Sequence, residues 1–157
     1  MTHLLRRRRG EEGFTLIELM VVVLILAVLL AIAIPVLQGA KDRASDRAAQ
    51  ANIHHALVAE HIVFTDSETF STSNAVLTAA EPRLVYVSTV PARNSREVYV
   101  GANDTGDTVV VGVQSYSGKC FWARDPSGNQ LRWNTSTDCS APPAVNDAGF
   151  TLNDPPG

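Results

Sequence analysis

Glu18 is the residue whose type and position most strongly suggest chemistry in this sequence. It stands at the start of a run, Leu19 to Leu37, that has no charged residue. A carboxylate in such a segment costs roughly 2.5 to 3.5 kcal/mol at the middle of a bilayer and less near its interface. An acidic residue there therefore indicates a functional site, and it needs a partner.

The apolar run from Leu19 to Leu37 is the element that must hold Glu18. As a helix with a rise of 1.5 Å per residue it would extend roughly 28 Å, close to the hydrocarbon thickness of a bilayer. The basic block Arg6 to Arg9 precedes it, so the positive-inside rule predicts a cytoplasmic N-terminus and an exported C-terminal body. An ordinary secretory signal carries its cleavage site after the apolar region, whereas here a charged leader and a glycine come before it.

The stretch from Gly13 to Leu19, Gly-Phe-Thr-Leu-Ile-Glu-Leu, resembles the class III signal of type IV prepilins and pseudopilins. In that family the membrane enzyme prepilin peptidase cleaves after the glycine and methylates the new N-terminal amine. The resemblance implies cleavage between Gly13 and Phe14, with N-methylation of Phe14. The family's buried glutamate matches Glu18, the fifth residue after the cut. A simple signal anchor would explain a charge near the interface, but not this whole motif.

Cleavage would create an amine at Phe14 that can serve as the partner of Glu18. The two residues are four apart, so a pair within one chain is geometrically open. The family resemblance instead implies a pair with the amine of a neighbouring subunit, which would set the axial register of a filament. The helix-kinking proline of the family matches Pro35, which lacks a backbone donor and is expected to kink or loosen the helix.

The pattern after Leu37 predicts one long helix and then a sheet. An amphipathic pattern continues the helix to about Val63, and a polar stretch with a short helix around residues 73–80 follows. Segments rich in Val, Tyr, Trp and Thr then predict strands, separated by short turns that favour antiparallel hairpins. These segments are residues 84–90, 97–102, 108–116, 119–124 and 130–134.

These elements predict an α+β fold, with a long N-terminal membrane-spanning helix packed at its C-terminal half against an antiparallel β-sheet head. This is the arrangement of the type IV pilin fold. The helix is expected to contact the sheet through Ile53, Leu57 and Phe64. Trp122 and Trp133 are expected in the core or on a face of the sheet.

Cys120 and Cys139 are the two cysteines of the chain, and both follow the apolar segment. An even pair in an exported domain is expected to form one disulfide, closing a loop of about twenty residues and contributing roughly 3 kcal/mol. Two separate buried thiols are the alternative.

Two polar clusters raise the question of a metal site. His54 and His61 lie seven residues apart on one helix face, but a zinc site needs further ligands, so a solvated or inter-subunit face is favoured. Asp104 and Asp107 lie in a turn with oxygen-rich spacing, similar to a calcium loop of major pseudopilins, yet such residues are also common turn formers. We therefore expect no metal and no cofactor, and Asp104 and Asp107 are kept as calcium candidates.

The charge distribution and the absence of catalytic motifs in the sequence argue against other classes of function. Residues 1 to 13 contain four arginines and two glutamates, so the net charge of -3 becomes -5 without them. An acidic body argues against a dedicated nucleic-acid surface, although a local basic strip stays open. No catalytic triad, nucleotide-binding or zinc motif is found in the sequence, so we expect no enzyme.

The sequence therefore divides into a cytoplasmic leader (1–13), a transmembrane and filament-core helix (14–37), an amphipathic helix (38–64) and a β head (65–157). The expected function is a structural subunit of a type IV pilus-like filament serving adhesion, motility or DNA uptake; a pseudopilin of a type II secretion system is the alternative. The expected partners are copies of itself, prepilin peptidase, the pilus or secretion assembly platform and the membrane. The subunit would cross the inner membrane once, and would then enter a cell-surface or periplasmic filament.

Overall fold

The structure is a computed structural model that describes residues 13–93, 96–127 and 130–152. The expected leader therefore lies outside the described residues, apart from Gly13. The chain divides into two compact units, Met1–Gly39 and Ala40–Gly157. Each unit is built around a different part of helix α1, Leu16–Ser67, which is 52 residues long.

The first unit contains the apolar part of α1. Its mean hydropathy reaches 3.3 over an 18-residue window, and none of that window is buried. Among the described residues α1 is the one helix long and apolar enough to cross a membrane. It continues through Pro35, as apolar helices with a proline commonly do. The kink expected at Pro35 stays a prediction.

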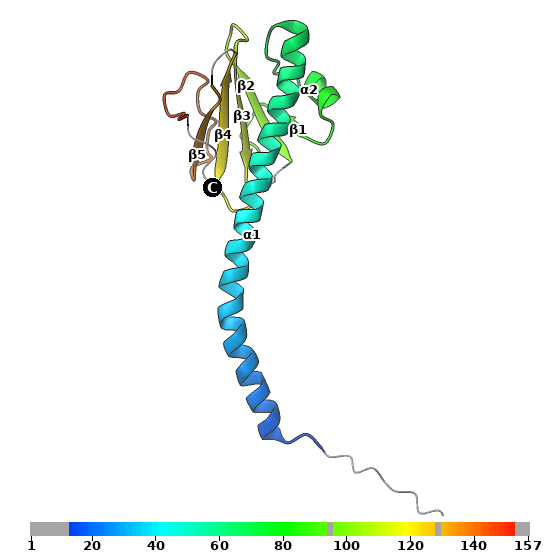
Figure 1. The fold of residues 1–157 in the computed structure, drawn as a ribbon, viewed down its shortest axis with the longest axis vertical. Coiled ribbons are helices and arrows are strands. Elements are labelled where there is room, and N and C mark those ends of the chain that lie inside the picture. Colours follow the sequence, from blue (N-terminus) through cyan, green and yellow to red (C-terminus); the bar gives the residue numbers. More distant parts are fainter. Residues whose placement is uncertain (1–12, 94–95, 128–129, 153–157) are drawn as a thin grey trace, which may run out of the picture. The chain divides into compact units, whose positions relative to one another are not determined.

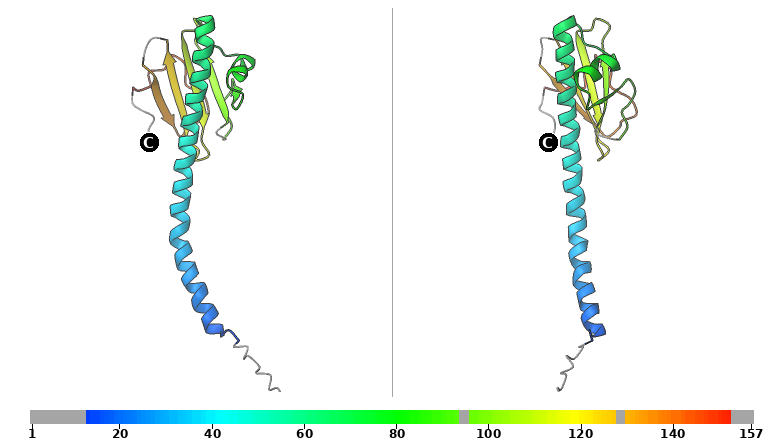
Figure 2. Two further views of the ribbon diagram at one scale, coloured as in Figure 1. Left: turned by 45° about the vertical axis from the view of Figure 1, so that its right-hand side comes forward. Right: turned by 90° about the vertical axis from the view of Figure 1, so that its right-hand side faces the viewer.

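The second unit is the head, in which the remainder of α1 lies along one face of a β-sheet (Figure 1). Helix α2, Asn74–Ala80, packs beside the edge strand β1, as the two views of Figure 2 show. α1 ends one turn later than the sequence predicted. Glu68 takes a left-handed φ of 58°, and its N–H donates to the carbonyl of Phe64 at 2.8 Å.

Within the described residues the sheet has five strands in the order β1-β2-β3-β4-β5, so neighbours in the chain are neighbours in space (Figure 1). The strands are β1 Val85–Val87, β2 Glu97–Ala102, β3 Thr108–Gln114, β4 Cys120–Pro126 and β5 Arg132–Ser136. β2 to β5 pair antiparallel through short links, as predicted. A long helix on a mostly antiparallel sheet confirms the α+β fold.

The pairing of β1 with β2 differs from the expected antiparallel meander. These strands are parallel, with Val85 opposite Glu97 and Val87 opposite Tyr99. The antiparallel pairs are joined by turns rich in Gly, Asn, Asp and Ser. The link between β1 and β2 covers residues 88–96, so these strands are not joined by a tight turn of the kind that imposes antiparallel pairing.

The core lies on both faces of the sheet, because alternate residues of a strand point to opposite sides. On one face, Val109, Val111 and Val113 pack with α1 and α2. The α1 side of this cluster includes residues spaced three and four apart, as an amphipathic helix requires. They are Ala49, Ile53, Ala56 and Leu57, together with Ala59, and Val63 and Phe64 are partly buried against them. The predicted helix-to-sheet contact is therefore confirmed.

The opposite face is covered by the C-terminal segment rather than by a helix. Val110, Cys120 and Trp122 form a second buried cluster with Phe150. Thr151 forms a bridge to Trp133 of β5, with two N–H to carbonyl bonds of 2.8 and 2.9 Å. A Cβ atom at Gly112 would overlap the ring of Trp122, so this position requires glycine. Both tryptophans are core residues, as expected.

Candidate functional site

Gly13 and Phe14 lie outside the helix, immediately before it. Both are exposed, and Phe14 has 76% of its surface accessible. A Cβ atom placed on Gly13 would have no described atom within 4 Å. The bond between these residues is therefore open to solvent, and its cleavage stays a prediction.

Glu18 forms a capping box with Thr15 at the start of α1. Its Oε2 accepts hydrogen bonds from the backbone N–H of Thr15 at 2.9 Å and from the Thr15 hydroxyl at 2.7 Å. In return, the N–H of Glu18 donates to the Thr15 hydroxyl oxygen at 3.3 Å. This is the reciprocal arrangement of the motif Thr-x-x-Glu, which satisfies donors that a helix N-terminus leaves unpaired.

The capping box adds a role to Glu18 that the sequence analysis missed, although its signal was the threonine three positions before the glutamate. The box holds the carboxylate beside the helix start, four residues from Phe14. A negative charge is also favoured there by the helix dipole. The geometry thus presents an anionic group close to where an amine at Phe14 would stand.

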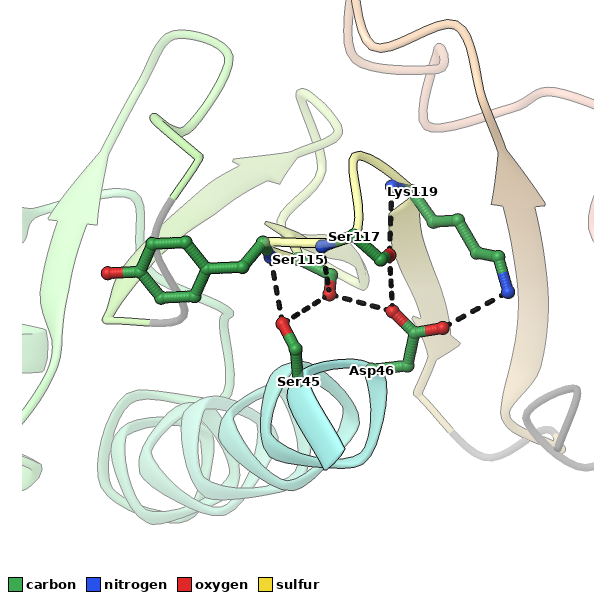
Figure 3. A network of polar contacts seen from close by, with 6 residues as sticks. Ser45, Asp46, Ser115, Ser117 and Lys119 are labelled. Carbon is green, nitrogen blue, oxygen red and sulfur yellow. Dashed lines mark hydrogen bonds and ion pairs between the residues drawn. The ribbon is translucent and has the colours of Figure 1, made fainter. Parts of the chain in front are cut away.

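A second polar cluster fixes α1 to the turn between β3 and β4 (Figure 3). Asp46 of α1 accepts hydrogen bonds from the hydroxyls of Ser115 and Ser117 at 2.7 and 2.5 Å. Its other oxygen pairs with the ammonium of Lys119 at 3.1 Å. Ser45 lies beside Asp46, and its hydroxyl is 2.7 Å from that of Ser115. We call these five residues the Asp46 cluster.

The Asp46 cluster stabilises the charged form of its carboxylate. Partial burial alone would raise the pKa of Asp46, but hydrogen bonds from Ser117 and Ser115 and the charge of Lys119 hold it below its usual value. The cluster acts at the point where α1 enters the head, since Ala40 is the first residue of that unit. It therefore fixes the turn of the β3–β4 hairpin on the helix.

The structure contains the disulfide between Cys120 and Cys139 that the sequence predicts. The two Cα atoms are 5.8 Å apart, and 19 positions separate the residues in sequence. Cys120 lies in the second buried cluster, with Cys139 packed against it. The bond holds the beginning of the C-terminal segment on the face of the sheet that this segment covers.

The polar residues near the end of α1 point in different directions. His54 contacts the ring of Trp133 at 5.3 Å between centroids, while His61 Nε2 lies 2.7 Å from Asp125 of β4. Glu60 is fully buried, and its Oε2 accepts the N–H of Ser71 at 3.0 Å. Within the described residues no group of three or more His, Cys, Asp or Glu could hold a metal.

Glu60 is an unusual core residue. Burial raises its pKa to about 7, although the Ser71 N–H lowers it. Among the described residues its Oε1 has no hydrogen-bond partner, and the same holds for the hydroxyl of Tyr86. A protonated Glu60 would be the less costly form at this position, because an isolated buried charge is expensive.

The Asn103 to Asp107 turn is closed by its own side chains. The Asn103 amide donates to Asp107 Oδ1 at 2.6 Å, and the Thr108 hydroxyl donates to the same oxygen at 2.9 Å. These hydrogen bonds lower the pKa of Asp107. The contacts describe a hydrogen-bonded hairpin turn, and calcium binding by Asp104 and Asp107 stays an untested expectation.

Comparison with known proteins agrees with the features of the N-terminus. Residues 8–34 match the family described as the prokaryotic N-terminal methylation motif. Together with this motif, the apolar helix and the α+β head resemble those of type IV pilins. The chain is 29% identical over 135 residues to the type IV wide pilus major component PilA4 of Thermus thermophilus, covering 85% of this chain and 96% of that protein. The motif and the apolar helix also support membrane anchoring.

Proposed function

We propose that this protein is the precursor of a type IV pilus subunit, which is held in the membrane by α1 and polymerises through it. The observation that carries the proposal is the contrast within one helix between an unburied apolar part and a part packed in the head. Burying a large aliphatic side chain is worth roughly 1.5 to 3 kcal/mol. The first part of α1 therefore needs lipid before assembly and neighbouring subunits afterwards.

The maturation step of this proposal is cleavage between Gly13 and Phe14 by prepilin peptidase, followed by methylation of Phe14. The exposed, non-helical position of both residues supports it. The basic block Arg6 to Arg9 would keep the leader in the cytoplasm, where the peptidase would act. After cleavage a charged amine stands four residues before Glu18.

The assembly step is a pair between Glu18 and the Phe14 amine of a neighbouring subunit. The capping box supports this role, because it holds the Glu18 carboxylate at the beginning of the helix. In a bundle of apolar helices each charge would be buried with few alternative partners. Pairing with the neighbour would therefore fix the axial register of the filament, and an assembly platform would add subunits in that register.

A pseudopilin of a type II secretion system is the alternative within the same family. The name of the similar Thermus thermophilus protein favours the pilus, since it is described as a wide pilus component. We accordingly place the mature protein first in the inner membrane, with its head exported, and then in a filament at the cell surface. Adhesion, motility and DNA uptake are the functions such a filament could serve.

Intact-mass measurement tests the maturation step directly. The chain would be produced together with a prepilin peptidase and recovered from membranes. We expect loss of residues 1 to 13 and the added mass of one methyl group on Phe14. A mature N-terminus beyond Leu37 would contradict the proposal.

The matched control for this experiment is Gly13→Val. A side chain at position 13 meets no described atom within 4 Å of its Cβ, so the substitution should leave the fold unchanged. We expect the variant to enter the membrane and to keep its leader. Normal processing of Gly13→Val would show that the glycine does not define the cleavage site.

A further inference from the structure

The loop after α1 is held to the head by two successive backbone groups. Residues 68–73, which we call the α1–α2 loop, connect α1 with α2, and four of the six are exposed. The N–H of Phe70 donates to the carbonyl of Gly106 at 2.8 Å, and the N–H of Ser71 donates to Glu60 Oε2 at 3.0 Å. Of these two acceptors, Glu60 is the one whose charge can change.

The α1–α2 loop also carries an aromatic side chain into the core. Phe70 is 6% exposed, and its ring lies 4.7 Å from that of Phe64 and 5.9 Å from that of His61, measured between centroids. Phe64 stands four residues after Glu60, so both lie on the same face of α1. The loop therefore covers Glu60 together with Phe70, and opening it would give both side chains access to water.

The closed loop offers little support for a charge on Glu60. Its Oε2 accepts one N–H, and among the described residues its Oε1 has no hydrogen-bond partner. β1 contributes the hydroxyl of Tyr86, which is buried and also has none within the described part of the chain. Burial and the charges of Glu81 and Glu60 raise the pKa of Tyr86 to about 12, so this hydroxyl stays neutral near pH 7. An ionised Glu60 would thus be buried with a single hydrogen bond.

The positive groups of the neighbouring elements are engaged elsewhere. His61 follows Glu60 on α1, but its Nε2 lies 2.7 Å from Asp125 of β4. Arg124, also of β4, donates to the carbonyl of Val145 at 2.6 Å. β2 and β3 contribute valines to this side of the core.

The acidic groups near the loop add no stabilisation for a charged Glu60. Glu68 and the carboxylates of the 103–107 turn are exposed, and α2 has no titratable residue. Burial therefore dominates, and it raises the pKa of Glu60 to about 7, although the Ser71 N–H lowers it.

We propose that Glu60 is a proton-operated latch on the α1–α2 loop. With its proton bound, the carboxyl keeps the loop closed over Phe70, and loss of the proton favours a transient opening that admits water to the carboxylate. Opening would expose Phe70 and the Ser71 N–H while the sheet stays folded. The latch belongs to the head alone, so it goes beyond the filament function and does not depend on it.

Proton linkage sets the direction and the range of the latch. The pKa of Glu60 is about 7 in the closed loop, and a solvated carboxyl in the open loop would return to the ordinary value of 4.5. The closed loop is therefore favoured fully below about pH 4.5, loses this advantage as the pH rises to about 7, and changes little above that. From pH 5 to pH 8 the open population should rise by roughly 70-fold.

Amide hydrogen exchange of the full chain in detergent micelles tests the latch. NMR would follow the amides of Phe70, Ser71 and Val111 between pH 5 and pH 8, with rates corrected for the ordinary pH dependence of amide exchange. Val111 is fully buried in β3 and reports unfolding of the whole head. We expect the protection of Phe70 and Ser71 to fall together by roughly 70-fold. Constant protection of Phe70 would overturn the latch, and so would a change confined to Ser71, which would report only its own hydrogen bond.

Low concentrations of urea separate the latch from unfolding of the whole head. Opening a short loop exposes little surface, so the exchange of Phe70 should hardly change with urea, whereas that of Val111 should accelerate. If Phe70 followed Val111 at every urea concentration, the loop would open only when the head unfolds, and the latch would be overturned.

Glu60→Gln removes the titrating group but keeps an oxygen for the Ser71 N–H, so we expect its Phe70 protection to be independent of pH. Asp66→Asn is the matched control, because it neutralises an exposed carboxylate of the same helix. His61→Gln removes a second group beside Phe70, since histidine also changes its charge near neutral pH. Both should keep the pH dependence of the unaltered chain.

A pH dependence that survives in Glu60→Gln, or that is lost in His61→Gln, would assign the response to another group and overturn the latch. If Glu60→Gln does not fold, the pH and urea series of the unaltered chain still decide between these outcomes.

Discussion

The two parts of α1 use the same secondary structure in opposite ways. From Leu19 to Leu37 the helix is apolar on every side, and its side chains remain exposed, as Leu24 at 65% and Leu37 at 70% show. From Ala40 onward it buries one side only, with Ile53 fully inaccessible and Leu57 at 5%. A helix that is apolar all round requires an apolar solvent or other helices, whereas an amphipathic helix is complete within its own domain.

This difference teaches that stability and assembly can be changed separately. Substitutions in the first part should change membrane insertion or filament assembly, because the side chains of this part do not belong to the hydrophobic core of the head. Substitutions in the head should change its free energy of unfolding, because its contacts lie within the chain. Four variants examine this separation.

Glu18→Ala should have the largest effect, and only on assembly. Removing the carboxylate makes the segment more apolar, so membrane insertion should persist. In a filament the mutation would leave the Phe14 amine unpaired, and losing one partner of a buried pair typically costs roughly 3 to 5 kcal/mol. Since every subunit repeats the contact, sheared filament should be almost lost relative to mature subunit in the membrane.

The control for Glu18→Ala is Asp66→Ala, which removes an exposed carboxylate from the other end of the same helix. We expect its filament yield to match that of the unaltered protein. A normal yield for Glu18→Ala would reduce Glu18 to an interfacial charge with a capping role, and the pairing with a neighbour would have to be abandoned.

Replacing both cysteines, Cys120→Ala with Cys139→Ala, should affect only the head. Loss of a bridge across 19 positions should lower the free energy of unfolding by about 3 kcal/mol, because the unfolded chain gains freedom. Denaturant unfolding of the full chain in detergent micelles, followed by the fluorescence of Trp122 and Trp133, measures this. Membrane flotation should not change. Equal loss of flotation and stability would contradict the separation of the two parts.

Glu60→Gln should make the stability of the head less dependent on pH. The folded-state pKa of about 7 lies above the ordinary value of 4.5, so this residue favours the folded state below about pH 4.5 and loses that contribution as pH rises through 7. The variant should therefore be more stable than the unaltered protein at pH 8, by about 3 kcal/mol. Melting temperatures at pH 5 and pH 8 provide the comparison. An unchanged pH dependence would show that Glu60 is charged and solvated in the folded protein.

Lys119→Gln should have the smallest effect. The ammonium of Lys119 pairs with Asp46, but about half of its side chain is exposed, and such pairs contribute roughly 0 to 1 kcal/mol. The hydroxyls of Ser115 and Ser117 should continue to hold Asp46. We expect a change in the free energy of unfolding below about 1 kcal/mol. A larger loss would mean that the ion pair, rather than the hydroxyls, fixes the turn.

Features encoded locally were predicted from the sequence. The strands β2 to β5 follow from alternating residues between turn formers, and β2 was predicted with its observed bounds. α2 follows from a short apolar pattern inside a polar stretch. The even pair of cysteines predicted the disulfide, because an exported domain leaves few other roles for it.

Features that depend on distant contacts were missed. Asp46 lies among other charged residues of α1, and nothing in sequence distinguishes it from Asp42. Its hydroxyl partner Ser115 is 69 positions away. Nothing in the local sequence predicts that Glu60 is buried, because the loop that encloses it begins eleven residues later, at Ser71. The parallel direction of β1 was missed because a link of nine residues allows either direction.

The capping box at Thr15 also affects how accessible the Gly13–Phe14 bond is to a protease. Because the capping box sets the beginning of the helix at Leu16, the Gly13–Phe14 bond lies in a non-helical part of the chain. Peptide bonds are cut most readily where the backbone is exposed and unconstrained by regular structure. If the helix continued two residues further toward the N-terminus, an enzyme would have to unwind it before each cut. Thr15 would thus influence cleavage by fixing where the helix begins, and a changed rate of cleavage in Thr15→Val would reveal it.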